Sequence, residues 1–134
     1  MTKTEKQKIG AWGENQASIF LSGLGYKIVD RNFTIVKNGK KAGEIDIVAW
    51  HKKVNFGRTL CFVEVKTRSY GVGSAERATN QKKKIATFLK TARQYCTEKE
   101  IDIERTPIQF EHVSVYIDQK NGKAVFKKYV IPIE

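Results

Sequence analysis

The sequence has few of the features that mark secreted, disulfide-bonded or membrane proteins. Its only two cysteines, Cys61 and Cys96, show no paired spacing, which excludes a disulfide framework and a zinc ribbon. No run of 18 apolar residues occurs, and the opening residues MTKTEKQK lack the apolar stretch of a signal peptide. We therefore expect a cytoplasmic protein with reduced thiols and no membrane segment.

Repeats and low-complexity tracts are also absent, which excludes solenoids and disordered arrays. Hydrophobic residues make up 40% of the 134. A chain of this length buries roughly two thirds of the surface that its unfolded form exposes, so it can build a core without disulfide bonds or a structural metal ion. These values predict a single domain over residues 1–134, with fraying expected in residues 1–7.

Acidic residues are scarce relative to basic ones. The chain has 14 Asp and Glu against 25 Lys and Arg, a net charge of +11. Such an excess on a small protein favours polyanions, because each phosphate that a Lys or Arg neutralises releases condensed counterions. Nucleic acid is the first expectation, and anionic lipid or the ribosome comes second.

The hydrophobic periodicity predicts an α/β protein with the order α-β-β-β-α-β-β and a central mixed sheet flanked by helices. Helical spacing extends from residue 8 to 24, where Gly25 can provide a left-handed cap, and a second helix is expected from Thr79 to about Lys99. An Asn38-Gly39 pair predicts a hairpin, and Pro132 indicates an edge strand or a strand end. The expected strands cover residues 26–32, 43–50, 60–67, 108–117 and 124–133, and a second extended piece at residues 33–36 leads from the first of them to the hairpin.

Two acids interrupt the apolar strand at residues 43–50. Strict alternation would place Glu44 and Asp46 on one side together with Val48, and would place Ile45 and Ile47 on the other. An acid between two isoleucines is unusual in a buried strand, because a buried charge needs a partner. Asp46 is therefore a candidate functional residue.

A second charged pair follows the apolar run at residues 60–63. Glu64 and Lys66 flank Val65, so they project from the same face of the strand. If this strand pairs with the one that carries Glu44 and Asp46, three carboxylates and an ammonium converge. Oxygen ligands suit Mg²⁺ or Mn²⁺, and a phosphodiester can complete the coordination shell, which is hydrolytic nuclease chemistry.

The alternative is a partly buried ion-pair network that only positions the strands. Three acids around one lysine would leave excess negative charge in such a network, and desolvation costs several kcal/mol per ion. Helix geometry adds Glu14, which lies at the edge of the apolar arc of the first helix and can lean over the sheet. The alternative for Glu14 is an exposed residue that favours the helix dipole.

These residues together resemble a known family. The motifs are Gly13-Glu14 in the first helix, Gly43-Glu44-Ile45-Asp46, Phe62-Val63-Glu64-Val65-Lys66-Thr67-Arg68, and Lys82 at the start of the second helix. They resemble the YraN-like family of bacterial proteins, over about Ile9 to Ile117. That family is similar to archaeal Holliday junction resolvases and belongs to the restriction-endonuclease-like PD-(D/E)XK superfamily, whose fold has the α-β-β-β-α-β order predicted above.

The resemblance implies a metal-dependent endonuclease acting on structured, branched DNA as a homodimer. It implies that Asp46 and Glu64 bind Mg²⁺ or Mn²⁺, that Glu14 contributes directly or through water, and that Lys66 is the catalytic lysine. Glu44 is a weaker candidate.

Nucleic-acid contacts are also expected around this centre. The resemblance places Arg68 and Lys82 near the scissile phosphate, and Lys83 either assists or belongs to a solvated helix face. Tyr70 either stacks on an unpaired base or seals its loop.

The chain departs from the family pattern in three places. The stretches before Gly43 and between Trp50 and Leu60 are longer, and Gln109-Phe110-Glu111 replaces Arg-Phe-Asp. The added stretches carry basic residues that either widen a nucleic-acid surface or solubilise loops, namely Lys40, Lys41, Lys52, Lys53 and Arg58. His51 and His112 are expected to be structural or surface residues.

Three functions therefore compete. The first is the endonuclease, the second is a nucleic-acid-binding accessory protein that keeps the fold without cutting, and the third is an interaction protein for acidic partners. Binding of a divalent ion separates the first two, and salt-dependent nucleic-acid binding separates both from the third.

Overall fold

The computed structural model of the chain describes residues 2–69, 81–118 and 121–133. Its elements are α1 (Lys3–Gly23), β1 (Lys27–Lys37), β2 (Lys40–Lys53), β3 (Gly57–Ser69), α2 (Gln81–Glu98), β4 (Ile108–Ile117) and β5 (Ala124–Val130). The five strands form one sheet in the order β1-β2-β3-β4-β5, in which only β3 and β4 are parallel. The predicted α/β class and element order are confirmed. Neither of the two helices in these ranges is long and apolar enough to cross a membrane.

Helix α1 begins at Lys3, five residues before the start that the apolar spacing predicts. Thr2 caps it: the Thr2 hydroxyl accepts the Glu5 amide N–H at 3.1 Å, and the Glu5 carboxylate accepts the Thr2 amide at 3.2 Å. The first turns carry no apolar stripe, so periodicity could not detect them. At the other end Gly25 has a φ of +93°, which confirms the expected left-handed residue after the helix.

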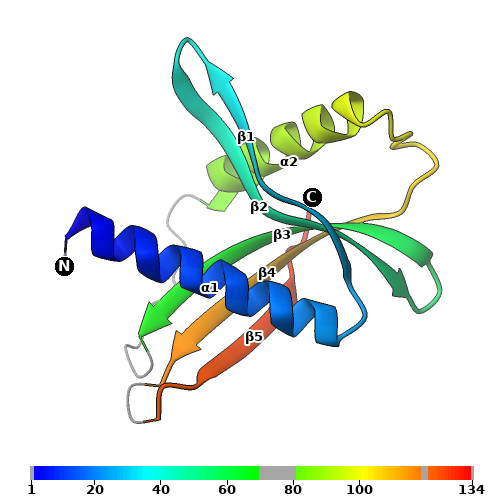
Figure 1. Ribbon diagram of the computed structural model, residues 1–134. Coiled ribbons are helices and arrows are strands. Elements are labelled where there is room, and N and C mark those ends of the chain that lie inside the picture. The colour runs from blue at the N-terminus through cyan, green and yellow to red at the C-terminus, as the bar shows by residue number, and fades with distance from the viewer. Residues whose placement is uncertain (1, 70–80, 119–120, 134) are drawn as a thin grey trace.

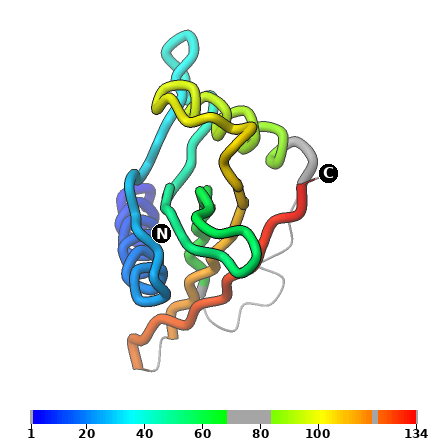
Figure 2. The backbone as a smooth tube through the Cα atoms, turned by 90° about the vertical axis from the view of Figure 1, so that its right-hand side faces the viewer, coloured from blue at the N-terminus to red at the C-terminus, as the bar shows by residue number. Residues whose placement is uncertain are grey.

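A long hairpin joins β1 and β2. The two extended pieces predicted at residues 26–32 and 33–36 form a single strand, and both Asn38 and Gly39 have positive φ, as a two-residue hairpin turn requires. In Figure 1 this hairpin projects beyond the rest of the sheet at the upper left, and Figure 2 shows its tip above α2. Backbone pairing thus extends both strands past the apolar residues that predicted them.

The helices cover opposite faces of the sheet (Figures 1 and 2). On the α1 side the buried core consists of Ala17, Leu21, Tyr26, Ile47, Ala49, Cys61, Val63, Val65, Val113 and Val115. On the α2 side it consists of Ile45, Val48, Leu60, Phe62, Phe88, Ala92, Tyr95, Cys96 and Phe110. Both cysteines are free and buried, and burial raises the pKa of the Cys61 thiol to about 12, so they are inert core residues as expected.

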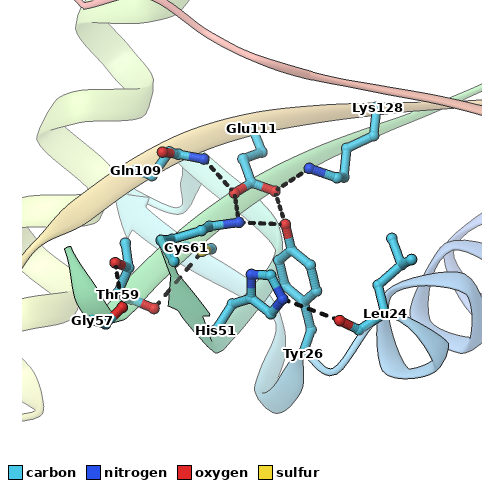
Figure 3. A network of polar contacts seen from close by, with 10 residues as sticks. Leu24, Tyr26, His51, Gly57, Thr59, Cys61, Gln109, Glu111 and Lys128 are labelled. Carbon is cyan, nitrogen blue, oxygen red and sulfur yellow. Dashed lines mark hydrogen bonds and ion pairs between the residues drawn. The ribbon is translucent and has the colours of Figure 1, made fainter. Parts of the chain in front are cut away.

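A buried polar network organises the end of the sheet where β3 and β4 begin (Figure 3). Glu111 has no exposed surface, and its carboxylate accepts hydrogen bonds from the Tyr26 hydroxyl at 2.7 Å and the Gln109 amide at 2.8 Å. The Glu111 carboxylate also forms ion pairs with the ammonium groups of Lys53 at 2.9 Å and Lys128 at 3.6 Å. Burial alone would raise the pKa of Glu111, but these hydrogen bonds and positive charges outweigh it and lower that pKa. The residue that replaces the family's Asp is thus part of a structural network.

Candidate functional site

Strands β2 and β3 separate at one end of their ladder, and we call the point beyond Ile47 and Val63 the fork. The two strands pair from Lys53 and Gly57 as far as Ile47 and Val63, and beyond that point β2 pairs only with β1 and β3 only with β4. Asp46 is the first β2 residue past the last pair. Its carboxylate accepts the backbone N–H of Val65 at 2.7 Å, so a side chain replaces the missing ladder hydrogen bond.

This fork corrects the strict alternation expected for β2. Ile45 belongs to the α2-side core together with Val48, whereas Ile47 belongs to the α1-side core. The prediction that Ile45 and Ile47 share a face is wrong, because the strand changes its facing at Asp46, where its ladder with β3 ends. The irregularity directs the Asp46 carboxylate to the β3 backbone.

Asp46 lies among other acids. Burial is the largest cause that raises its pKa to about 7; the Val65 hydrogen bond opposes the shift, and the charges of Glu14, Glu44 and Glu64 add to it. Burial likewise raises the pKa of Glu14, although the charge of Arg31 opposes this. A strand that served only as scaffold would gain stability by replacing such a carboxylate, so the cluster is a functional candidate.

Glu14 has an unusual environment. Its Oε1 atom is buried and has no hydrogen-bond partner within the described chain. An unpaired buried carboxylate oxygen costs free energy, and a bound cation or its water would remove that cost. The helix-wheel prediction that Glu14 leans over the sheet agrees with this position.

Two glycines that precede these acids allow the close approach of the helices. A Cβ at Gly13 would lie 1.7 Å from the Thr67 hydroxyl on β3, and a Cβ at Gly43 would lie 2.1 Å from the Thr91 hydroxyl on α2. Only glycine permits either contact. The Gly13-Glu14 and Gly43-Glu44 pairs therefore place one helix against each prong of the fork.

A pocket borders the fork between α1 and the end of β3. It is lined by Lys6, Ile9, Gly10, Glu14, Val65, Lys66, Thr67, Arg68 and Ile117. It includes three residues that the sequence singled out (Glu14, Lys66 and Arg68) and adds Lys6, which the sequence analysis missed. The missed signal is the four-residue spacing of Lys6, Gly10 and Glu14, which places them on one helix face.

Glu64 contacts α2, on the side of β3 opposite to α1 and the pocket, and its side chain is a quarter exposed. Its Oε1 atom is 3.9 Å from the Lys84 ammonium and 3.8 Å from Nδ1 of His112, its partner on β4. His112 also bonds the buried Ser114 hydroxyl at 3.0 Å and stacks on Tyr129. Sequence could not identify His112 as a neighbour of Glu64, because the parallel β3–β4 register depends on the intervening crossover.

The sequence also predicts nucleic-acid contacts at Tyr70, Lys82 and Lys83. Tyr70 lies outside the described residues, as does Thr79, the expected cap of the second helix. Lys82 and Lys83 belong to the first turn of α2, and only their backbone is described.

No group of three or more His, Cys, Asp or Glu side chains within residues 2–69, 81–118 and 121–133 is arranged to hold a metal ion. The acids therefore interact through their charges without forming a ready-made cage.

Comparisons with known proteins agree with the family resemblance. The model of the "Uncharacterised protein family UPF0102", the YraN-like family, matches residues 13–115. The chain is 37% identical over 125 residues to a UPF0102 protein of Koribacter versatilis, covering 92% of this chain and 79% of that one. It is 36% identical over 118 residues to one of Alkaliphilus oremlandii, covering 87% and 92% of the two chains. A relative from Corynebacterium efficiens is 35% identical over 132 residues, covering 95% and 93%.

Proposed function

The chain belongs to the uncharacterised protein family UPF0102, and from its candidate site we propose that it is a metal-dependent endonuclease of the PD-(D/E)XK type. Its substrate is structured DNA, branched DNA included. The observation that carries this proposal is the position of Asp46 at the fork, where its charge interacts with those of Glu14, Glu44 and Glu64. Lys66 is two residues beyond Glu64 on the same strand.

The side chains at the fork fit a hydrated divalent cation. Mg²⁺ keeps several waters and usually takes one or two protein carboxylates, so a cage of three ligands is not needed. The orphan Oε1 of Glu14 and the raised pKa of Asp46 both favour a nearby positive charge. Asp46 and Glu64 would hold the ion, and Glu14 would contribute directly or through water from the α1 side of the fork. When bound, the ion would polarise the phosphodiester and lower the pKa of a water molecule.

The protein's own residues have separate tasks in this proposal. The side chain of Lys66 is exposed and ends in an ammonium group without an oxygen ligand. Lys66 therefore stabilises the negative charge of the transition state and does not coordinate the ion. Lys6 and Arg68 line the same pocket and attract the phosphate backbone. Asp46 is held by its hydrogen bond from Val65, so its carboxylate is oriented before any ligand arrives.

A non-catalytic accessory protein is the second candidate. The absence of a three-ligand cluster in the described part of the chain favours it. In that case the basic surface binds nucleic acid, and the acids at the fork bind no ion. A homodimer with two sites, each addressing one DNA strand, belongs to the first proposal only.

Cleavage and metal binding together test the two candidates. Four-way junction, nicked, duplex and single-stranded DNA are incubated with Mg²⁺ or Mn²⁺, while calorimetry measures metal affinity. We expect Lys66→Ala to keep the metal isotherm and most DNA affinity and to lose cleavage by about 10²-fold or more. The matched control is Lys27→Ala, which removes an exposed lysine at the end of β1 that lies away from the fork.

Two results would count against the endonuclease. If the wild-type protein binds no divalent ion and cuts none of these substrates or their RNA equivalents, the accessory function is favoured. If Lys66→Ala cuts at the wild-type rate, Lys66 has no part in the mechanism. Size-exclusion chromatography with light scattering tests the dimer separately.

A further inference from the structure

The hairpin of β1 and β2 forms a two-stranded arm beyond the fork. We define the basic arm as residues 33–45, in which Phe33 pairs with Ile45 and Lys37 pairs with Lys40 around the Asn38-Gly39 turn. Among the described strands, none pairs with β2 past Ile47 except β1. The arm therefore projects as a two-stranded ribbon (Figure 1), and its base at Ile45 adjoins Asp46 of the candidate site.

Residues 35–43 of the basic arm contain three lysines and no acid. Val36 and Lys41 are cross-strand partners, and so are Lys37 and Lys40, so the two pairs lie on opposite faces of the ribbon. Lys37, Lys40 and Lys41 are all exposed. Positive charge thus occurs on both faces of one narrow ribbon.

Each face has a distinct electrostatic relation to the rest of the protein. Lys41 forms an ion pair with Glu44, and its charge also interacts with those of Asp46 and Glu14, so its face is turned toward the candidate site. On the other face, contact with the Lys90 ammonium of α2 lowers the pKa of Lys37. Two ammonium groups in contact favour an anion between them, because an anion removes their repulsion.

We propose that the basic arm enters the major groove of duplex DNA next to the site of cleavage, an inference that rests on the proposed function. The major groove of B-DNA is about 12 Å wide and admits a two-stranded ribbon. Phosphate backbones then pass along both faces of the arm, where Lys41 contacts one strand and Lys37 with Lys90 contacts the other. The deep, narrow major groove of an RNA duplex excludes such a ribbon, so the arm selects DNA.

The second basic insertion does not share this role. Lys53 is only 14% exposed and forms an ion pair with the buried Glu111. The guanidinium carbon of Arg58 lies 3.9 Å from the centre of the Trp50 ring, over which it stacks. Both lie at the end of the β2–β3 ladder that is opposite to the fork. Of the two additions that could widen a nucleic-acid surface, only the one before Gly43 lies beside the candidate site.

Two triple variants with equal charge test the arm. One carries Lys37→Gln, Lys40→Gln and Lys41→Gln. The control carries Lys27→Gln, Lys52→Gln and Arg105→Gln, which are exposed and lie away from the fork. Affinity for a 30-base-pair DNA duplex, the same RNA duplex and single-stranded DNA is measured between about 50 and 200 mM salt in EDTA, so neither metal nor cleavage is needed.

We expect the arm variant to bind duplex DNA about tenfold more weakly at 0.1 M salt for each lysine that contacts a phosphate. The log-log salt slope should fall by about 0.9 per contact, with little change in the control. Glucosylated cytosines, which fill the major groove, should weaken wild-type binding, whereas a minor-groove ligand should not.

Equal losses in the two variants, or equal wild-type affinity for DNA and RNA duplexes, would overturn the role of the arm. So would a lack of any wild-type binding to duplex DNA. A protein that binds as expected but never cuts would refute the endonuclease and leave the role of the arm intact.

Discussion

Replacing Asp46 with asparagine should stabilise the metal-free protein at neutral and alkaline pH. Burial raises the pKa of Asp46 from 3.8 to about 7 in the folded state. The folded protein therefore binds a proton more tightly than the unfolded chain does. Stability from this proton uptake is fully present below pH 3.8 and is lost as the pH rises through about 7. The asparagine side chain of the Asp46→Asn variant carries no charge at any pH, so the variant lacks this loss.

The magnitude follows from the size of the shift. About three pK units, at 1.36 kcal/mol each, set an upper limit of about 4 kcal/mol on the cost of the ionised carboxylate. An asparagine oxygen can still accept the Val65 N–H, but its buried amide group needs a partner of its own and costs about 1–2 kcal/mol. We expect a net gain of about 2 kcal/mol above pH 7.5 and almost none near pH 4.5.

Urea denaturation in EDTA between pH 4.5 and 8.5 measures the difference between the two proteins. Asp102→Asn serves as the control, since Asp102 is 57% exposed and lies outside the fork. Excess Mg²⁺ should reverse the order at pH 8, because only a charged carboxylate gains from the ion. The reasoning is wrong if Asp46→Asn is no more stable than wild type at pH 8, or if its advantage is the same at pH 5.

Three further predictions test other parts of the structure. Gly13→Ala should destabilise the protein by about 1–3 kcal/mol in thermal or urea unfolding, because the added methyl group would overlap Thr67. Gly10→Ala should stabilise α1 by about 0.5–1 kcal/mol, because its added methyl group would meet no atom within 4 Å apart from its chain neighbours and the backbone of its own helix. Equal effects of the two would refute the close approach. Glu64→Gln should weaken the metal isotherm while DNA affinity in EDTA holds or rises, because a negative charge is lost; an unchanged isotherm removes Glu64 from the ligands. Glu111→Gln should cost about 3 kcal/mol at pH 7 by leaving its lysine partners without a counter-charge, with a smaller loss below pH 4, and no loss at pH 7 would contradict the buried network.

Local rules were sufficient where an element depends on its own residues. The Asn38-Gly39 turn and the left-handed Gly25 followed from backbone preferences, and β4 from a segment rich in β-branched and aromatic residues. The same rules predict Asp46, Glu64 and Lys66 as candidate site residues, because a charge inside an apolar strand is visible without a structure. Family membership could also be recognised from these motifs.

Only the tertiary structure decided how the site residues face one another. Alternation could not reveal the change of face at Asp46, because it arises where β2 leaves β3, which is a property of the whole sheet. The position of His112 beside Glu64 depends on the parallel crossover, and the pocket that Glu14 and Lys66 line together depends on the docking of α1 against β3. The two basic insertions look alike in sequence and differ only in position, since one forms the arm beside the fork and the other carries Lys53 into a buried network. Residue type is a local property, but burial, pKa and proximity result from contacts between distant segments, and these exist only after the chain has folded.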